Sequence, residues 1–145
     1  MNPKPPSVNE GLAEADLLGR FATARIARLA TVSAAGRPHL VPITFALVGS
    51  VVVSAVDHKP KATIELQRLR NIRATGRASV LVDEYDDDDW SRLWWVRLDG
   101  SARVLPQCER ATEWLAAKYR QYRDHPPGGP FVWIDTDTVR GWNHG

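Results

Sequence analysis

The stretch RIARLATVSAAGRPHLVPITFALVGSVVVSA, residues 25–55, decides the fold of this chain. Apolar and polar residues alternate before the segment SAAGRP, and apolar residues resume from Leu40 to Leu47. A period of two on both sides of a glycine-containing turn predicts two strands joined as a hairpin. The β-branched run VVVSA, residues 51–55, predicts a third strand. Because Pro42 has no backbone N–H to donate, it predicts a sheet edge, a bulge or a place left open to a ligand.

Outside this stretch, the sequence predicts three helices and three further strands. The helices are expected over residues 7–24, 61–72 and 107–123, and the strands over residues 78–85, 93–105 and 131–142. We therefore expect an α+β fold in which six antiparallel strands curl into a barrel with flanking helices, because closure removes unpaired edges. Residues 1–7 are rich in proline and are expected to form a flexible tail, and residues 8–145 to form a single domain.

Local signals refine these elements. Ser7 and Glu10 have the spacing of a capping box at the start of the first helix, and Gly100 suggests a bend in the long strand over residues 93–105. The third helix has an apolar stripe that predicts its buried side: Ala111, Leu115, Tyr119 and Tyr122.

Composition limits the classes of function. The chain has 145 residues, 43% of them hydrophobic, and a net charge of only +2, so it is not expected to bind nucleic acid. Cys108 is the only cysteine, which excludes an internal disulfide and favours a reducing, cytoplasmic location. No apolar run is long enough to predict a membrane span.

Cationic side chains gather in the stretch SAVDHKPKATIELQRLRNIRATGRAS, residues 54–79. If the second helix starts near Pro60, Lys61, Arg68 and Asn71 share one face of it. Lys59 lies at the start of the helix, where unpaired N–H groups already attract anions, so the pattern predicts a phosphate-binding site. The alternative is a solvated helix face whose arginines pair with Glu65 and with the acidic stretch DEYDDDD, residues 83–89.

Other groups of reactive residues carry weaker signals. The four histidines have no acidic or cysteine neighbours at metal-ligand spacing, so no metal site is expected. Cys108 starts an amphipathic helix and is interpreted as a packing residue. Trp94 and Trp95 must point to opposite faces of a strand. Dimer burial, stacking on a bound ring and core packing all remain open for them.

The order and spacing of four segments resemble the pyridoxamine-phosphate-oxidase-like split barrels, which bind FMN. These segments are RIARLATVSAAGRPHLVPITFAL, VVVSAVDHKPK, LQRLRNIRATGRASVLVDEY and WWVRLDGSARVL. The spacing DHKPK…LRNI is most similar to the actinobacterial branch that uses the deazaflavin coenzyme F420. The resemblance implies a six-stranded split barrel that forms a homodimer, with two cofactor sites at the subunit interface.

The resemblance also assigns residues to that site. It implies that the cofactor's phosphate and acidic tail are held by Lys59, Lys61, Arg68 and Asn71. It implies that the ring is lined by Pro42, Thr44, Ser54, Ala55 and Val56. His39 and one of Trp94 and Trp95 would reach the pocket from the partner subunit.

The implied activity is hydride transfer between reduced F420 and a small conjugated or aromatic acceptor. The cofactor carries this chemistry, so no catalytic acid or base is assigned. Two alternatives stay open: an FMN-dependent oxidase, and a non-catalytic carrier of a cofactor or other ligand. The C-terminal segment VRGWNHG lacks the arginine and histidine pattern of a true pyridoxamine-phosphate oxidase.

Overall fold

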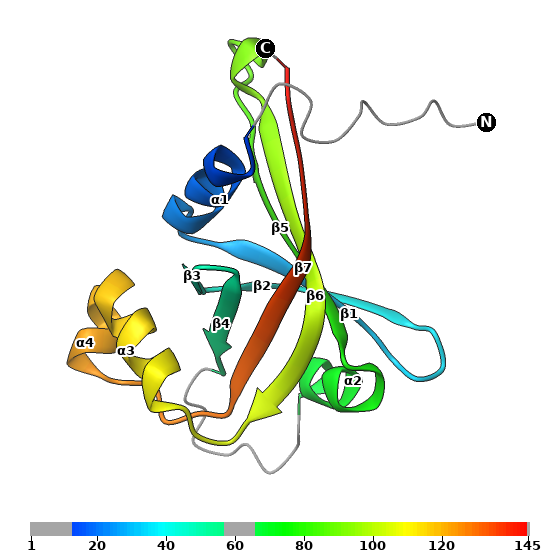
Figure 1. Ribbon diagram of the computed structural model, residues 1–145, viewed down its shortest axis with the longest axis vertical. Helices are drawn as coiled ribbons and strands as arrows, with labels where there is room; N and C mark the ends of the chain where they lie inside the picture. The colour runs from blue at the N-terminus through cyan, green and yellow to red at the C-terminus, as the bar shows by residue number, and fades with distance from the viewer. Residues whose placement is uncertain (1–12, 57–65, 145) are drawn as a thin grey trace.

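A computed structural model of the chain describes residues 13–56 and 66–144. Its centre is one antiparallel sheet with the strand order β2-β1-β5-β6-β7-β4-β3 (Figure 1). The strands are β1 (Ala27–Val32), β2 (Pro38–Ile43), β3 (Ala46–Val48), β4 (Val51–Ala55), β5 (Arg77–Glu84), β6 (Trp94–Leu105) and β7 (Phe131–Asn143). The helices are α1 (Glu14–Thr23), α2 (Gln67–Thr75), α3 (Glu109–Lys118) and α4 (Arg120–Asp124), with a short 3₁₀ helix η1 (Trp90–Arg92).

The predicted hairpin is confirmed as β1 and β2, which pair from Ala27 with Ile43 to Val32 with Pro38. Its turn closes through a bond from the Ser33 N–H to the Arg37 carbonyl, with Gly36 in the left-handed region at a φ of 84°. Because β2 is an edge strand, Pro42 lies where a missing N–H is tolerated, as expected.

The prediction of one continuous strand from Leu40 to Leu47 is wrong. The chain leaves β2 after Ile43 and starts β3 at Ala46, so this strand divides in two and the sheet has seven strands instead of six. β2 and β3 stand at opposite ends of the strand order, yet Thr44 and Phe45 alone connect them. Three Cα-to-Cα steps span at most roughly 11 Å. The two edges must therefore approach each other, which curls the sheet into a split barrel.

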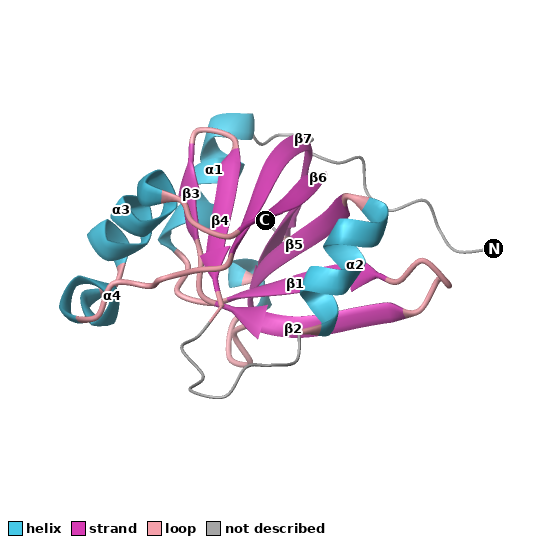
Figure 2. Cartoon of the chain, turned by 90° about the horizontal axis from the view of Figure 1, so that it is seen from below, coloured by secondary structure: helices cyan, strands magenta, loops and turns pink. Residues whose placement is uncertain are grey.

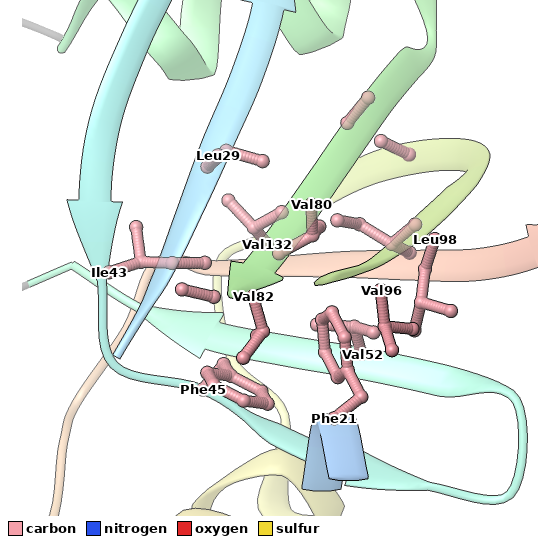
Figure 3. Close-up of a cluster of buried hydrophobic side chains, with 14 of the residues drawn as sticks. Phe21, Leu29, Ile43, Phe45, Val52, Val80, Val82, Val96, Leu98 and Val132 are labelled. Carbon is pink, nitrogen blue, oxygen red and sulfur yellow. The ribbon is translucent and has the colours of Figure 1, made fainter. Parts of the chain in front are cut away.

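The interior of the barrel is filled by buried apolar side chains from β1, β2, β4, β5, β6 and β7 (Figure 3). Phe21 of α1 and Phe45 of the β2–β3 link are completely buried, and their rings meet edge to face with centroids 4.9 Å apart. A second cluster lies between α3 and the strands β3, β4 and β7, where Leu115 packs among Val53 and Phe131. Helices therefore cover the β3–β4 side of the sheet, and α2 covers the β1 side (Figure 2).

Helix boundaries differ from the predicted ones. The described part of the first helix begins at Glu14 after Ala13, and the predicted capping box of Ser7 and Glu10 lies outside the described residues. α2 begins at Gln67, not near Pro60, because Leu66 has an extended backbone with ψ of 147°. The predicted helix therefore does not run unbroken through Leu66, and Lys61 lies outside the described residues.

The third predicted helix is broken at Tyr119, whose backbone is extended with φ of −114° and ψ of 127°. The Tyr119 hydroxyl accepts a hydrogen bond from the Phe45 N–H at 3.1 Å and donates one to the Arg25 carbonyl at 2.8 Å. These long-range bonds offer a physical reason for the break. The predicted buried side is confirmed for Ala111, Leu115 and Tyr119, and Tyr122 is half-buried.

Among the described residues, no helix has both the length and the apolar character that crossing a bilayer requires.

Gly100 provides a test of the packing between β6 and β7. The predicted bend is confirmed as a register shift between Asp99 and Gly100, and a Cβ at Gly100 would collide with the Asp135 carbonyl. We expect Gly100→Ala to lower the free energy of unfolding by about 1–3 kcal/mol, measured by urea denaturation. In the control Gly19→Ala, on the open side of α1, nothing meets the new methyl group. That control should be stabilised by about 0.5–1 kcal/mol. Equal stabilities for the two variants would contradict this packing.

Candidate cofactor-binding site

A polar hollow of about 470 Å³ lies between the β1–β2 turn and the start of α2. The turn and β2 contribute Ser33, Arg37 and His39, and α2 contributes Gln67 and Asn71. The turn and the start of β2 place Arg37 and His39 near Gln67 at the N-terminus of α2. Cationic and amide side chains thus face a common space, which suits an anionic ligand.

Asn71 fastens α2 to the sheet beneath this hollow. Its side chain is 1% exposed, and its amide donates to Thr31 Oγ1 at 3.0 Å while accepting from Gln67 Nε2 at 2.7 Å. Thr31 is also buried, so these hydrogen bonds offset the cost of removing both polar side chains from water. Asn71 therefore shapes the floor of the hollow, and its amide oxygen and nitrogen both have protein partners.

His39 contributes to the lining a buried side-chain nitrogen that lacks a hydrogen-bond partner among the described residues. Its Nδ1 has almost no exposed surface and no hydrogen bond there. Buried polar atoms in proteins are nearly always satisfied, so this nitrogen suits a ligand group that enters the hollow. His39 lies directly opposite Thr31 in the β1–β2 register, which brings it near the Asn71 network.

The N-terminus of α2 adds a positive field to the same place. The apolar Leu66 side chain caps none of its N–H groups, and its first turn contains no acidic residue. Gln67, the first residue of the helix, lines the hollow. Uncapped N–H groups and the helix dipole favour an anion at this end.

The basic stretch contributes less to the described site than its sequence suggests. Lys59 and Lys61 lie outside the described residues, and Arg68 is half-buried on α2 outside the lining of the hollow. Arg77 forms an ion pair with Asp137, with Nη1 2.8 Å from Oδ2, and this hydrogen bond raises the pKa of Arg77. Arg77 is thus paired with a carboxylate of the protein, though with Asp137 of β7 and not with Glu65 or the acidic stretch of residues 83–89.

The predicted ring-lining residues gather at the seam where β2 and β3 meet. Ser54 Oγ donates to the Thr44 carbonyl at 2.7 Å, and Thr44 Oγ1 shares a hydrogen bond of 2.9 Å with the Tyr122 hydroxyl. Ala55 and Val56 are buried at the end of β4, and Pro42 is exposed at the edge of β2. The structure thus brings Thr44 and Ser54 together, as it does His39 and Asn71.

Trp94 and Trp95 do not reach this site within one chain. Thr31 lies at the level of Ala78 in the sheet and Trp95 at the level of Asp83, five residues further along β5. That offset corresponds to roughly 17 Å. The predicted opposite orientation is confirmed: Trp94 packs against the core, and Trp95 lies on the other face beside Arg97.

The sequence analysis did not identify Arg37, Gln67 or Lys118, which lies against the Phe45 ring beside the β2–β3 seam. The Lys118 ammonium lies 3.7 Å from the centroid of the Phe45 ring and has no hydrogen-bond partner among the described residues. Burial, together with the nearby Arg25, lowers the pKa of Lys118 to about 8. The helical periodicity indicated the buried tyrosines of this segment, but it gave no signal that a lysine would join them.

The described residues contain no group of histidine, cysteine, aspartate and glutamate side chains that could hold a metal ion.

Comparison with known families identifies the chain. The sequence profile described as pyridoxamine 5'-phosphate oxidase matches residues 14–144. The chain belongs to this family. No curated protein matches the sequence.

Solved structures share the fold of this pyridoxamine 5'-phosphate oxidase family member. A FAD-binding protein from Mesorhizobium loti aligns with a TM-score of 0.66 and 22% identity over 90% of this chain and 94% of its own. A conserved hypothetical protein from Mycobacterium tuberculosis aligns with a TM-score of 0.69 and 22% identity, over 92% of this chain and 86% of its own. The FAD-binding protein from Mycobacterium smegmatis aligns with a TM-score of 0.61 and 16% identity, over 90% of this chain and 95% of its own. At these identities the likeness establishes the split-barrel fold.

The low pKa of Lys118 predicts a specific pH dependence of stability. Its pKa of about 8 in the folded state is below the ordinary value of 10.5, so between these values the unfolded chain binds the additional proton. Stability from this group therefore rises as the pH rises from 8 to 10.5. We expect Lys118→Met to stabilise the protein by about 1 kcal/mol at pH 7, after allowance for solvent screening and for attraction to the Phe45 ring.

This gain should shrink as the pH approaches 10, measured by chemical denaturation across the range. Arg110→Met, on the exposed surface of α3, removes a charge that does not titrate there and serves as the control. A gain that is independent of pH would contradict the assigned pKa.

Proposed function

We propose that the protein binds a phosphate-bearing cofactor of the flavin type at the hollow between α2 and the β1–β2 turn, and that it is an oxidoreductase. The observation that carries the proposal is the buried, unpartnered Nδ1 of His39 beside Arg37 and the uncapped start of α2. Membership of the pyridoxamine 5'-phosphate oxidase family supports it. Two of the similar structures are described as FAD-binding proteins, which agrees with this class of ligand.

The residues present fit the phosphate end of such a cofactor. Arg37 offers a guanidinium fork, and His39 and the first N–H groups of α2 supply further donors. Lys59, Lys61 and Arg68 are proposed to contact additional acidic groups of the tail. Thr44 and Ser54 are proposed to form one wall beside the ring. When bound, the cofactor supplies hydride chemistry, and the protein orients it and excludes water.

We propose F420 as the cofactor and hydride transfer to a small conjugated or aromatic acceptor as the reaction. The spacing DHKPK…LRNI supports this choice through its resemblance to the F420-dependent branch. One observation favours the alternative, FMN. Arg77 is already paired with Asp137, so fewer cations are left for the polyglutamate tail that distinguishes F420.

We further propose that the protein acts as a homodimer with cofactor sites between the subunits. Arg97 of β6 and Arg140 of β7 occupy directly paired positions on the outer face of the sheet, where they could contact a second copy. Trp94 and Trp95 are remote from the hollow within one chain, so a partner related by two-fold symmetry would be needed to bring them near.

The test is a parallel titration of the purified protein with F420 and with FMN, followed by fluorescence. We expect F420 to bind more tightly than FMN. His39→Ala and Arg37→Ala should each weaken binding by about 1.5–3 kcal/mol, the usual cost of losing a charged hydrogen bond. The controls are His125→Ala, just after α4, and Arg110→Ala on α3, both exposed and outside the lining of the hollow.

Tight binding of FMN alone would replace F420 by FMN in the proposal. If the cofactor binds but no acceptor is reduced, the protein is a carrier. If neither cofactor binds, or if His39→Ala and Arg37→Ala bind like the controls, the proposed site is wrong.

A further inference from the structure

Two tyrosine hydroxyls of the α3–α4 unit hold the β2–β3 link from outside the barrel (Figure 2). The Tyr119 hydroxyl bonds to main-chain groups on both sides, the Phe45 N–H and the Arg25 carbonyl. The Tyr122 hydroxyl instead meets a side chain, Thr44 Oγ1, at 2.9 Å. Tyr119 therefore fixes the path of the link, whereas Tyr122 acts on a side chain that the proposed function assigns to the wall beside the cofactor ring.

Tyr122 is held in place independently of Thr44. Its ring stands edge to face against the Tyr119 ring, with centroids 5.6 Å apart and planes at 85°. The next residue, Arg123, donates from Nη1 to two carbonyls in the last turn of α3, at 3.0 and 3.2 Å. These carbonyls have no partner within the helix, so the bonds tie α4 to the end of α3. The helices thus set the position of the Tyr122 hydroxyl, and Thr44 adapts to it.

The Thr44 hydroxyl is left with a proton to donate. Among the described residues, its Oγ1 has one hydrogen-bond partner, Tyr122. A phenol is a better donor than an aliphatic alcohol, which favours the arrangement in which Tyr122 donates and Thr44 accepts. A hydroxyl that accepts one hydrogen bond can still donate another, and the two bonds strengthen each other. The proton of Thr44 is then available to an acceptor that enters the seam.

The main chain around Thr44 keeps this hydroxyl at a fixed place. The Thr44 carbonyl accepts a hydrogen bond from Ser54 Oγ at 2.7 Å, and the next residue, Phe45, is completely buried. The Thr44 side chain itself is half-buried, so a ligand can reach it. A fixed backbone and an oriented hydroxyl at the edge of the core suit a group that binds a ligand.

We propose that Tyr122 is a positioning residue, which orients the Thr44 hydroxyl so that its proton is donated to a carbonyl oxygen of the bound cofactor ring. The inference rests on the proposed function, which assigns Thr44 to the wall beside that ring. Flavin and deazaflavin rings both carry carbonyl oxygens at one edge, so the role is the same for FMN and for F420. Tyr122 acts only through Thr44.

Two pairs of ligands separate ring contacts from phosphate contacts: FMN with riboflavin, and F420 with its phosphate-free deazaflavin core. Dissociation constants for the full-length protein are measured by fluorescence. We expect Tyr122→Phe to weaken binding of both members of a pair by the same factor, about three- to ten-fold for one misplaced hydrogen bond. Arg37→Ala should weaken binding of the phosphate-bearing member alone. In Tyr122→Phe, a loss confined to the phosphate-bearing ligand would contradict the proposal.

A double-mutant cycle tests whether Tyr122 acts through Thr44, with the cofactor that binds the wild-type protein. Thr44→Val removes the hydroxyl and keeps the shape of the side chain, so Tyr122→Phe should cause no further loss of affinity in that background. Thr44→Ser retains the hydroxyl and should stay sensitive to Tyr122→Phe. Losses that add in the Thr44→Val background would overturn the proposal.

The absorption spectrum of the bound ring distinguishes this role from a merely structural one. A hydrogen bond to a ring carbonyl shifts the visible absorption maximum, so Tyr122→Phe and Thr44→Val should move the maximum in the same direction. Tyr119→Phe is the matched control, because it loses the main-chain bonds of the same link. It should lower the midpoint of urea unfolding and leave the maximum unchanged. If the maximum moves equally in Tyr119→Phe, the path of the link is responsible and the proposal is wrong.

Failure of this inference and failure of the proposed function give different results. If the wild-type protein binds neither FMN nor F420, the proposed function is wrong and the role of Tyr122 fails with it. If a cofactor binds, and Tyr122→Phe and Thr44→Val bind it like the wild type, the role of Tyr122 alone is wrong. Thr44 and Tyr122 are only half-buried, so their cycle keeps the test valid if Tyr119→Phe fails to fold.

Discussion

The two-residue link between β2 and β3 is the constraint on which the rest of this structure depends. Thr44 and Phe45 join strands at opposite ends of the sheet order, and so short a connection closes the sheet into a barrel. The link is held on both sides. Phe45 packs in the core against Phe21 and donates its N–H to Tyr119, and Thr44 bonds Ser54 and Tyr122. The break between α3 and α4 allows both tyrosines to reach the link from outside the barrel.

The same closure creates the conditions for a ligand site at one end of the sheet. The β1–β2 hairpin extends beyond the barrel, and α2 is fastened beside it by the buried bond from Asn71 to Thr31. Arg37 and His39 of the hairpin then face the uncapped N-terminus of α2. An anion would satisfy the buried His39 nitrogen and the helix N–H groups together. The proposed site would therefore hold a phosphate through local positive groups, without requiring a large net charge on the chain.

Periodicity predicted the elements that depend on local patterns, such as the β1–β2 hairpin and the bend at Gly100. It failed at places set by distant contacts. Nothing in the apolar run from Leu40 to Leu47 marks a break, because the closing barrel imposes it. The break at Tyr119 coincides with bonds to Phe45 and Arg25, which lie far away in sequence. At the site, family resemblance indicated His39 and Asn71, but Arg37 and Gln67 join them only through the docking of α2, which spacing along the chain does not reveal.

The central claim is that the hollow beside α2 receives the phosphate end of a flavin-type cofactor. Nuclear magnetic resonance of the protein labelled with ¹⁵N tests it most directly, through the His39 imidazole and the backbone amides of Gln67 and Arg68. On addition of F420 or FMN, the account predicts that His39 Nδ1 and these amides shift together, whereas the indole of Trp114, packed between α3 and β7, does not. Cofactor binding that leaves the His39 and α2 signals unchanged would contradict it.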